Sequence, residues 1–389
     1  MSKDKLSRGI LFSVTIAFWF SQYGYTPYVN PQLIMMGVTA SVMGIIGGAY
    51  GFTQFILRIP IGISSDRWQR KFFVCAGSLC TALASLCMFV FHNPIGFLVG
   101  RALGGVGASS WVPCTVLYTS YYKPEHATRS ITTINVANNL GRVVSYLMAA
   151  FITARFGQQS AFILCMIGGF SAFVISLIIR EDKALSTKIP LTIRELLAVG
   201  SERNLLITSF LGICVQLITF ATITSFTSNH AVGIGASSAQ LGIMYVALLL
   251  PGIILGFCLS KFILLKVDAK TLVVLGFLFS ALYCSLVTFT TEIWQLYIVQ
   301  ILGGIGSTLT FSLLMGISVL RITSEKRGAA MGFYQALYGI GMTLGPVIMG
   351  LVTDALNLRI GFILMAGIAV LSSATAAVFL KKTGVISNS

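Results

Sequence analysis

The sequence has few charged residues and very few acids. Only 10% of its 389 residues are charged, and the acids among them number 11. Hydrophobic residues make up 56% of the chain, and a soluble protein could not hydrate a surface of that composition. The scarcity of charge therefore excludes an ordinary soluble fold and predicts an integral membrane protein built from helices.

Sites for nucleotide, metal and covalent chemistry are missing as well. The sequence has no GxxxxGK[ST] nucleotide loop, no metal-ligand cluster and no nucleophile–base pair. The cysteines all fall within apolar runs, at positions 75, 80, 87, 114, 165, 214, 258 and 284. Their spacing fits no metal site, and we expect them to pack between helices without a disulfide. We therefore expect no enzymatic activity, no cofactor and no metal.

No acid or histidine lies in the middle of an apolar run. The acids are Asp4, Asp66, Glu125, Glu181, Asp182, Glu195, Glu202, Asp268, Glu292, Glu325 and Asp354. All of them, and all three histidines, lie in polar segments or at the ends of apolar runs. No carboxylate or imidazole is therefore available to carry a proton through the centre of the membrane.

The net charge of +15 could indicate nucleic-acid binding, but its distribution indicates topology instead. Of the 26 Lys and Arg residues, 21 lie in every second connecting segment, three lie inside apolar runs and two lie in the remaining loops. This bias follows the positive-inside rule, so the basic segments are predicted to be cytoplasmic. The expected partner is the lipid bilayer, and no nucleic-acid partner is expected.

Twelve apolar runs, each long enough to cross ~30 Å of hydrocarbon, predict an all-α membrane protein with both termini in the cytoplasm. The runs lie near 9–29, 40–63, 72–91, 94–119, 130–154, 159–180, 204–227, 238–260, 270–290, 293–319, 328–353 and 358–380. The first run is too long for a signal-peptide core and no small-x-small site follows it, so we expect it to be retained.

The runs form two sets of six that resemble each other. Residues 104–109 (GGVGAS) match residues 303–308 (GGIGST), and residues 162–164 match residues 362–364 at nearly the same separation. A degraded copy of residues 62–67 lies at 256–261. The predicted fold is therefore two pseudo-symmetric six-helix bundles, 1–180 and 204–389. The polar stretch 181–203 between them is expected to be a cytoplasmic linker.

The segment after the second run carries the most informative motif, Gly62-x-x-x-Asp66-Arg67-x-x-Arg70-Lys71. Gly62 would let a neighbouring helix approach closely. Asp66 could accept hydrogen bonds from a helix N-terminus. Arg67 and Arg70 could pair with Asp66 or with lipid phosphate. Arg58 lies about one turn inside the run, so we expect it to reach toward Asp66 rather than to bind a ligand.

This spacing resembles the loop between helices 2 and 3 of the major facilitator superfamily of secondary transporters. The resemblance implies a gating role for Gly62, Asp66, Arg67 and Arg70, because that loop clamps the cytoplasmic gate. The alternative is a generic positively charged loop, which explains neither the spacing nor the internal repeat.

Arg101 lies in a second motif, about three turns into the fourth run. The pattern Arg101-x-x-Gly104-Gly105-x-Gly107 resembles a signature that is prominent in drug/proton antiporters of the same superfamily. A charge at this depth costs about 2.5–3.5 kcal/mol on insertion scales, so it needs a partner. Two roles stay open for Arg101: a contact to the substrate, and a structural bond to polar groups of the first helix such as Gln22.

The fifth run departs from the antiporter pattern. Drug antiporters carry a Gly-Pro pair there, whereas this chain reads NNLGRVVS over residues 138–145, with Arg142 near the bilayer midplane. The eleventh run retains Gly345-Pro346. An arginine at this depth without a buried acid indicates an anionic ligand. Arginine rather than lysine suggests two-pronged recognition of a carboxylate or phosphate.

Further polar and aromatic residues could line a cavity between the halves, although each could equally pack against a neighbouring helix. The predicted substrate-binding residues are Arg142, Arg101, Gln22, Tyr25, Asn138, Gln216, Tyr334 and Tyr338.

The resemblance covers essentially the whole chain and implies a monomeric transporter in the inner membrane of a prokaryote. Such a protein moves a small molecule by alternating access, without ATP hydrolysis. Two mechanisms stay open. Arg142 and the missing buried acids indicate uniport or exchange of an organic anion, whereas the antiporter-like signatures indicate proton-coupled efflux of drugs or metabolites. A remote third alternative is a non-transporting receptor or an enzyme built on the same fold.

Overall fold

The computed structural model describes residues 3–123, 126–181, 200–259, 266–320, 322–323 and 326–381, and these residues contain helices and connections but no strand. The first six membrane segments are α1 (Lys3–Tyr23) with α2 (Thr26–Met35), α3 (Ala40–Arg67), α4 (Arg70–Val90), α5 (Pro94–Ser109) with α6 (Trp111–Ser120), α7 (Ala127–Phe156) and α8 (Ser160–Ser176). The second six are α10 (Arg203–Ala221) continued by the π-helical turn η3 (Thr222–Phe226) and α11 (Thr227–Gly233), α12 (Ser238–Cys258), α13 (Ala269–Val287), α14 (Ile293–Leu320), α15 (Arg327–Ala355) and α16 (Leu358–Phe379).

The prediction of twelve membrane segments in two bundles of six is confirmed. Within the described residues, nine segments are long and apolar enough to span a membrane by themselves. The other three have local reasons to differ: α1 is interrupted before α2, α8 is short, and α7 carries Asn138, Asn139 and Arg142 near its centre. The predicted linker 181–203 lies largely outside the described residues, as do the last two residues of the degraded motif copy at 256–261.

Side-chain caps define where several helices begin. Asn93 accepts a hydrogen bond from the backbone N–H of Gly96 at 2.9 Å, and Pro94 occupies the first turn of α5, where its missing N–H has no cost. Asp268 and Glu202 cap α13 and α10 in the same way. The cap at Asn93 lets α5 begin after a connection of only three residues, 91–93, from the end of α4.

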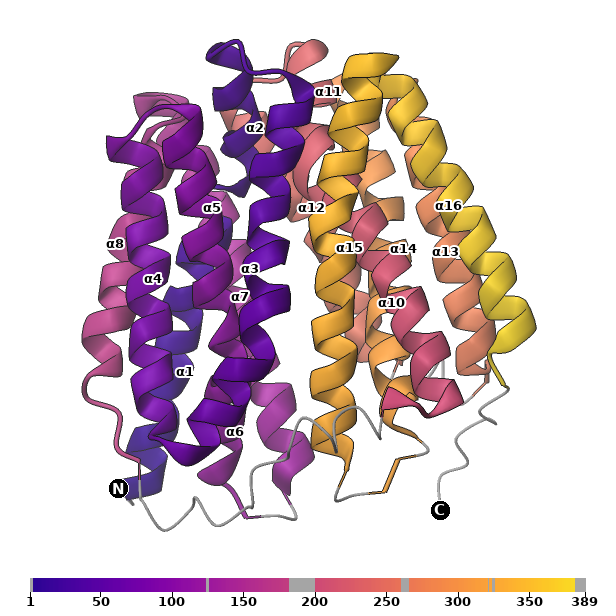
Figure 1. Ribbon diagram of the computed structural model, residues 1–389. Helices are drawn as coiled ribbons and strands as arrows, with labels where there is room; N and C mark the ends of the chain where they lie inside the picture. The colour runs from indigo at the N-terminus through magenta and orange to yellow at the C-terminus, as the bar shows by residue number, and fades with distance from the viewer. Residues whose placement is uncertain are drawn as a thin grey trace.

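The helices stand roughly parallel, and α1 begins at the same end of the molecule at which α16 ends (Figure 1). We call this the proximal end, which the charge pattern predicts to be cytoplasmic, and we call the opposite end the distal end. The two halves meet along α3 and α15, which lie side by side at the centre of Figure 1 and diverge toward the proximal end. The structure therefore holds the halves together at the distal end.

Glycines let α3 and α15 approach to backbone contact. A Cβ added at Gly44 would lie 2.3 Å from the carbonyl oxygen of Pro346, and one at Gly48 would lie 2.5 Å from that of Thr343. A Cβ at Gly51 would lie 2.5 Å from the backbone of Met342. Small residues at a helix–helix interface have this effect in membranes. The contact between the halves is therefore made largely by backbone rather than by interlocking side chains.

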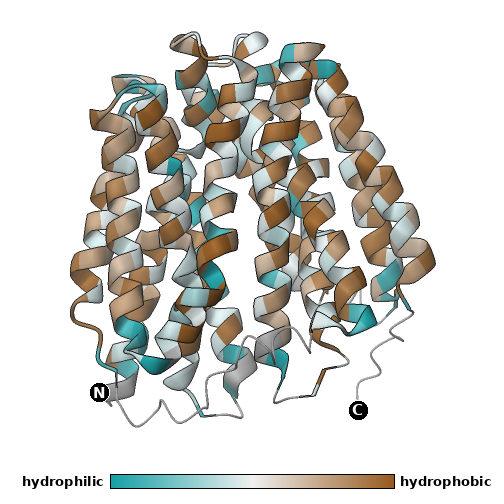
Figure 2. Cartoon of the chain, in the orientation of Figure 1, coloured by the Kyte–Doolittle hydropathy of each residue, from teal (hydrophilic) through white to brown (hydrophobic). Residues whose placement is uncertain are grey.

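The surface of the bundle is apolar around its middle. Brown residues cover the outer faces of the helices in Figure 2, while teal residues collect at both ends and on a few turns of the central helices. Exposed side chains such as Phe151, Leu371 and Val378 lie on this belt. Such a belt would be insoluble in water and fits the lipid bilayer as the surrounding solvent.

Candidate functional site

Two facing helices are interrupted near their centres. In the first half α1 gives way to α2 at residues 24–25, and in the second half α10 passes into α11 through η3. The two interruptions are separated by about as many residues as the matching segments 104–109 and 303–308, so they are equivalent positions of the repeat. Interrupted helices at equivalent positions frame the binding site in several transporter folds. π-helical turns also tend to mark functional sites.

The interruption in the first half depends on close packing around Gly24. A Cβ at Gly24 would lie 2.2 Å from the hydroxyl oxygen of Ser145 and 2.8 Å from the sulfur of Cys165. The Ser145 hydroxyl donates to the carbonyl oxygen of Phe20, which is the acceptor one turn before Gly24. Because only glycine fits here, α7 and α8 can hold the end of α1 directly.

The interruption in the second half is held by hydroxyl groups. The Thr227 hydroxyl donates to the carbonyl oxygen of Thr222 at 3.0 Å and also contacts the Tyr283 hydroxyl on α13. The Tyr245 hydroxyl on α12 donates to the carbonyl oxygen of Thr224 at 3.1 Å. Tyr245 therefore binds a backbone carbonyl of the π-helical turn directly, and Tyr283 holds the Thr227 hydroxyl that binds a second carbonyl.

A small pocket lies between the two interruptions and is lined from both halves. Its walls include Thr26, Asn30 and Arg101 of the first half and Thr224 and Ser225 of the second. The Asn30 amide donates to the carbonyl oxygen of Ser225 at 3.2 Å, across the boundary between the halves. The repeat therefore places polar groups of both bundles at one point.

Arg101 lies on α5 against this pocket, with 4% of its surface exposed. Its guanidinium carbon is 4.7 Å from the centre of the Tyr50 ring on α3, a cation–π contact, and the group also interacts with the Tyr25 hydroxyl. Tyr50 stacks in turn on Phe220 of α10, with ring centres 5.9 Å apart. Arg101 thus reaches the second half through one aromatic side chain.

Arg142 occupies a similar setting on α7. Its guanidinium carbon is 4.2 Å from the centre of the Tyr23 ring, and the group interacts with the Tyr146 hydroxyl. The Tyr146 ring lies 5.2 Å from the ring of Tyr245, whose hydroxyl also binds η3. Arg142 is therefore linked through two tyrosines to the interrupted helix of the other half.

Arg58 was expected to lie about one turn inside the membrane edge and to reach toward Asp66. The expected reach toward Asp66 is wrong. Arg58 lies about two and a half turns before the end of α3, which continues to Arg67, and it contacts the other half instead. Its Nη1 donates to the Tyr338 hydroxyl and to the carbonyl oxygen of Gln335 at 3.4 Å, both on α15. Arg58 is 5% exposed and is a third arginine at the boundary between the halves.

The three arginines share one more property. The Nε atom of each is buried and has no hydrogen-bond partner among the described residues. The chain has no Asp or Glu in the middle of any membrane segment to neutralise them. In the described part of the chain, no group of His, Cys, Asp or Glu side chains could hold a metal ion. The arrangement therefore suits an anion better than a cation or a metal.

Gln22 and Tyr25 lie at the site but are occupied by protein contacts. The Gln22 amide donates to the carbonyl oxygen of Gly104, and the Tyr25 hydroxyl donates to the Gln22 side-chain oxygen at 3.3 Å. Tyr25 is fully buried and stacks on Phe162 of α8. These contacts join α1 to α5 and α8, so both residues position Arg101 in this conformation.

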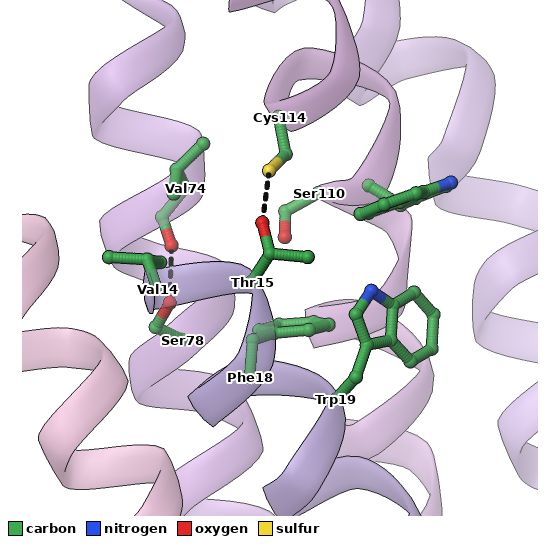
Figure 3. Close-up of a pocket in the computed structure, with 9 residues that line it drawn as sticks. Val14, Thr15, Phe18, Trp19, Val74, Ser78, Ser110 and Cys114 are labelled. Atoms are coloured by element: carbon green, nitrogen blue, oxygen red, sulfur yellow. Dashed lines mark hydrogen bonds between the residues drawn. The ribbon is translucent and has the colours of Figure 1, made fainter. Parts of the chain in front are cut away.

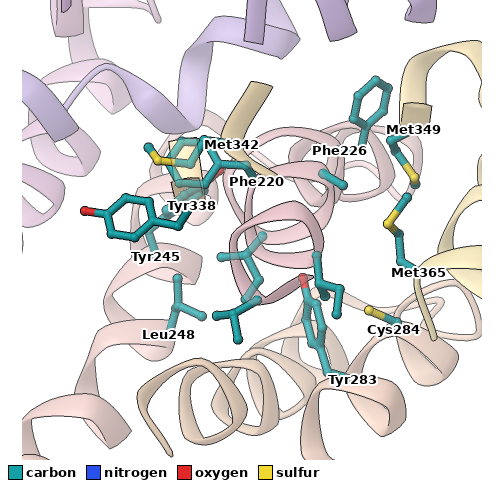
Figure 4. Packing of buried hydrophobic residues seen from close by; sticks show 14 of the residues in the cluster. Phe220, Phe226, Tyr245, Leu248, Tyr283, Cys284, Tyr338, Met342, Met349 and Met365 are labelled. Atoms are coloured by element: carbon teal, nitrogen blue, oxygen red, sulfur yellow. The ribbon is translucent and has the colours of Figure 1, made fainter. Parts of the chain in front are cut away.

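The remaining predicted residues lie on the faces that border the boundary. Asn138 is one turn before Arg142 on α7 and is partly exposed, and Gln216 is one turn before Phe220 on α10. Figure 4 shows Phe220, Tyr338 and Met342 gathered at one side of the second-half core, with Tyr245 beside them.

Tyr334 and Tyr338 form an edge-to-face pair on α15 with ring centres 5.7 Å apart. Tyr338 accepts the hydrogen bond from Arg58, while the fully buried Tyr334 hydroxyl has no partner among the described residues. Tyr50 and Tyr146 belong to the site but were not predicted. Their signal was present in Tyr50, Gln54 and Arg58, which repeat every four residues on one face of a helix.

The predicted gating residues lie at the proximal end. Gly62, Asp66 and Arg67 belong to α3 itself, so the connection to α4 is only the pair 68–69. A Cβ at Gly62 would meet only Val112, at 3.9 Å, so the expected close helix approach is absent in this conformation. Arg67 is exposed and Arg70 is buried, while the Asp66 side chain lies outside the described residues.

A carboxylate other than Asp66 binds the N-terminus of α4. Glu181, just after the sixth segment, accepts a hydrogen bond from the backbone N–H of Lys71 at 2.8 Å. Lys71 in turn donates from its ammonium group to the carbonyl oxygen of Leu177. The start of α4 is therefore fastened to the end of the first bundle.

An apolar pocket inside the first half supports the Arg142 region from behind. Figure 3 shows Val14, Phe18 and Trp19 of α1 around it, together with the Thr15–Cys114 contact. The Trp19 ring lies 5.5 Å from the Tyr23 ring, which itself lies under Arg142. The pocket therefore leaves room behind the aromatic side chains that surround Arg142.

Comparison with known families gives one match over nearly the whole chain. The model described as Major Facilitator Superfamily matches residues 11–263 and 208–386. The chain is 24% identical over 335 residues to an uncharacterized MFS-type transporter of Methanocaldococcus jannaschii, covering 83% of this chain and 85% of the relative.

Two named relatives are similar over comparable lengths. Identity to the inner membrane transport protein YajR of Escherichia coli is 22% over 324 residues, which cover 82% of this chain and 70% of YajR. Identity to the quinolone resistance protein NorA of Staphylococcus aureus is 21% over 344 residues, which cover 84% of this chain and 85% of NorA.

Solved structures share the fold at lower identity. The nucleoside transporter NupG superposes with a TM-score of 0.76 at 13% identity, covering 97% of this chain and 100% of NupG. The human organic anion transporter MFSD10 superposes with a TM-score of 0.71 at 15% identity, covering 97% of this chain and 100% of MFSD10. At these identities the likeness concerns the fold alone.

Proposed function

Because this chain belongs to the Major Facilitator Superfamily and is a secondary transporter, we propose that its substrate is an organic anion held by Arg142 and Arg101. The observation that carries the proposal is the pair of guanidinium groups beside the interrupted helices, each with a buried Nε atom, in membrane segments without a central acid. A buried charge is costly unless something offsets it. A transported anion would supply the missing charge.

The chemistry of the two sites supports a carboxylate or phosphate group. A guanidinium is planar and can bind two oxygens at once, and Nε is one of the donors on the edge used for such pairing. In both Arg101 and Arg142, the Nε atom has no hydrogen-bond partner among the described residues. Tyr23 and Tyr50 hold the guanidinium planes from one side, which leaves the donor edges for a ligand.

The second candidate is proton-coupled efflux of drugs or metabolites. It is favoured by the similarity to NorA, a quinolone resistance protein, over most of both chains. It is opposed by the absence of an acid or histidine from the centres of the membrane segments.

Ligand binding by Arg142 is tested with purified protein and a panel of organic anions and cations in a thermal-shift assay. Arg142→Gln should weaken anion binding by roughly 30-fold or more, the lower range for removing one partner of a buried charge pair. Arg142→Lys should weaken it by about tenfold, because an ammonium cannot make the paired contact. Arg155→Gln is the matched control, since Arg155 lies exposed on the same helix.

Coupling is tested by uptake into proteoliposomes with and without an imposed pH step. On the present proposal anions raise the melting temperature of the wild type, and uptake does not follow the pH step. Proton-linked efflux instead predicts flux that follows the step and ligands that are neutral or cationic. The anion proposal is wrong if flux follows the gradient and Arg142→Gln still binds the ligand.

We also propose the membrane topology, the bounds of the two bundles and the oligomeric state. The basic connections place both termini and the linker 181–203 in the cytoplasm, with bundles spanning 1–180 and 204–389. The contacts between the halves bury the boundary within one chain, which supports a monomer as the working unit. In this arrangement the distal end, held closed, faces outward.

A further inference from the structure

A polar cluster lies on α3 and α15, at the boundary between the halves and on other helices than Arg142 and Arg101. It consists of Gln54 and Arg58 of α3 with Tyr334, Gln335 and Tyr338 of α15. We call it the α3–α15 cluster. Gln54 is 3% exposed, Arg58 5% and Tyr334 0%. Polar groups buried this deeply are normally hydrogen-bonded.

Much of the hydrogen-bonding capacity of this cluster is unused. Arg58 donates hydrogen bonds from Nη1 to the Tyr338 hydroxyl and the Gln335 carbonyl oxygen. Its Nε atom, the Gln54 amide nitrogen and the Tyr334 hydroxyl have no partner among the described residues, nor has the Gln335 side-chain oxygen. Three of these four groups can donate, and one of them is positively charged. The cluster therefore offers hydrogen-bond donors to the acceptor oxygens of a ligand.

The cluster borders the site already described. Tyr50 lies one turn from Gln54 and two turns from Arg58 along the same face of α3. Arg101 packs on the Tyr50 ring at 4.7 Å. Tyr50 also interacts electrostatically with both Arg58 and Arg142. Tyr50 therefore contacts Arg101 directly and interacts at longer range with Arg58 and Arg142, so an extended ligand could reach from one pole to the other.

We propose that the α3–α15 cluster is a second anion-binding pole, and that the transported anion carries two negatively charged groups. One group binds Arg142 and Arg101, and the other binds the free edge of Arg58 with Gln54 and Tyr334. This inference rests on the proposed function, since it assigns the second charge of the same substrate. Three guanidinium groups with buried Nε atoms and no central acid are better neutralised by a dianion than by a monoanion.

The test compares ligands that differ only in the second charge. Succinate, glutarate and adipate are paired with butyrate, valerate and hexanoate, and affinity for the purified full chain is measured by thermal shift and by calorimetry. The wild type should prefer at least one dicarboxylate over its monocarboxylate partner by about tenfold or more. Arg58→Gln should reduce this ratio to near one, while monocarboxylate affinity changes less than threefold. Arg359→Gln, which removes a cation that packs on Phe289, should leave the ratio unchanged.

Gln54→Leu keeps the inference testable if Arg58→Gln does not fold. It removes one neutral donor from the same pole and should lower the dicarboxylate preference by about three- to tenfold without affecting monocarboxylates. The second pole is wrong if no dicarboxylate is preferred, or if the variants weaken both members of a pair equally. The proposed function fails separately, when no anion binds the wild type or when Arg142→Gln leaves anion binding intact.

Discussion

Asp354 closes the distal end of the molecule across the boundary between the halves. It lies at the end of α15, and its two carboxylate oxygens accept hydrogen bonds from the backbone N–H groups of Ala40 and Ser41, at 2.9 and 2.8 Å. These N–H groups form the start of α3, where a negative charge is favoured by the helix dipole. We predict that Asp354→Ala shifts the protein toward the state that is open at this end.

The size of the effect follows from the geometry. Replacing a side chain that caps a helix start by alanine costs about 0.5–2 kcal/mol. Asp354 is exposed to solvent, so a value of about 1 kcal/mol is appropriate. Its hydrogen bonds join the two halves and exist only when the distal end is closed. The whole loss therefore appears in the equilibrium between the two states, as a change of about fivefold in their ratio.

The assay measures access to a buried position behind Asp354. Thr26 is 5% exposed and lines the pocket between the interrupted helices. In a cysteine-free background, Thr26→Cys is labelled in intact cells with a membrane-impermeant thiol reagent. Asp354→Ala should raise the labelling rate by about fivefold. Glu292→Ala is the control, since it removes an exposed carboxylate from a loop in the same half. Equal labelling rates in all three backgrounds would refute the role of Asp354.

Three further predictions follow from the structure and the charge pattern. Gly24→Ala should lower the melting temperature and the yield of folded protein, because a methyl group would lie 2.2 Å from the Ser145 oxygen. The double variant Gly24→Ala with Ser145→Gly should recover part of the loss. If it recovers nothing, the clash with Ser145 is not the cause. Asp66→Asn should reduce transport while sparing ligand affinity, through a shift of about 1–3 kcal/mol between states; unchanged flux would exclude a gating role. Reporters fused near Lys188 and Asn93 should lie on opposite sides of the membrane. Finding them on the same side would rule out the twelve-segment topology.

The topology was predictable because it depends on properties summed over many residues. Each apolar run is about twenty residues long, and the basic connections alternate with uncharged ones. No single substitution disturbs such a pattern. Helix ends were less predictable. The charged residues 64–67 were expected to form a loop, but they extend α3 because Asp, Arg and Ser tolerate a helix once it has left the hydrocarbon.

The interruptions of α1 and α10 could not be predicted from local sequence. Residues 222–226 read TITSF, with neither glycine nor proline. The π-helical turn is stabilised by Tyr283 and Tyr245, which come from other helices. Gly24 is visible in the sequence, but its meaning depends on Ser145, which lies more than a hundred residues away. Contacts of this kind become apparent only when the helices are packed.

The candidate site was predicted in part for the same reason. Arg101 and Arg142 stand out because a charge in an apolar run is rare. Arg58 was set aside because it lies near the end of the apolar run, and its contacts with Tyr338 and Gln335 on α15 could not be anticipated from that position. Tyr50 and Tyr146 resemble many other aromatic residues until their contacts with the arginines are known.

The three arginines also bear on how the empty protein returns to its starting orientation. With no acid nearby, an unloaded carrier must enclose uncompensated positive charge each time its two ends exchange. Burying an unpaired charge costs several kcal/mol even after relaxation, and every 1.36 kcal/mol slows a step tenfold. On the proposed function, a carrier filled with an anion avoids this barrier. Its loaded form would then turn over faster than its empty form, so that release of one anion would be followed by uptake of another before the protein resets. The proposal therefore implies one-for-one exchange rather than net flux.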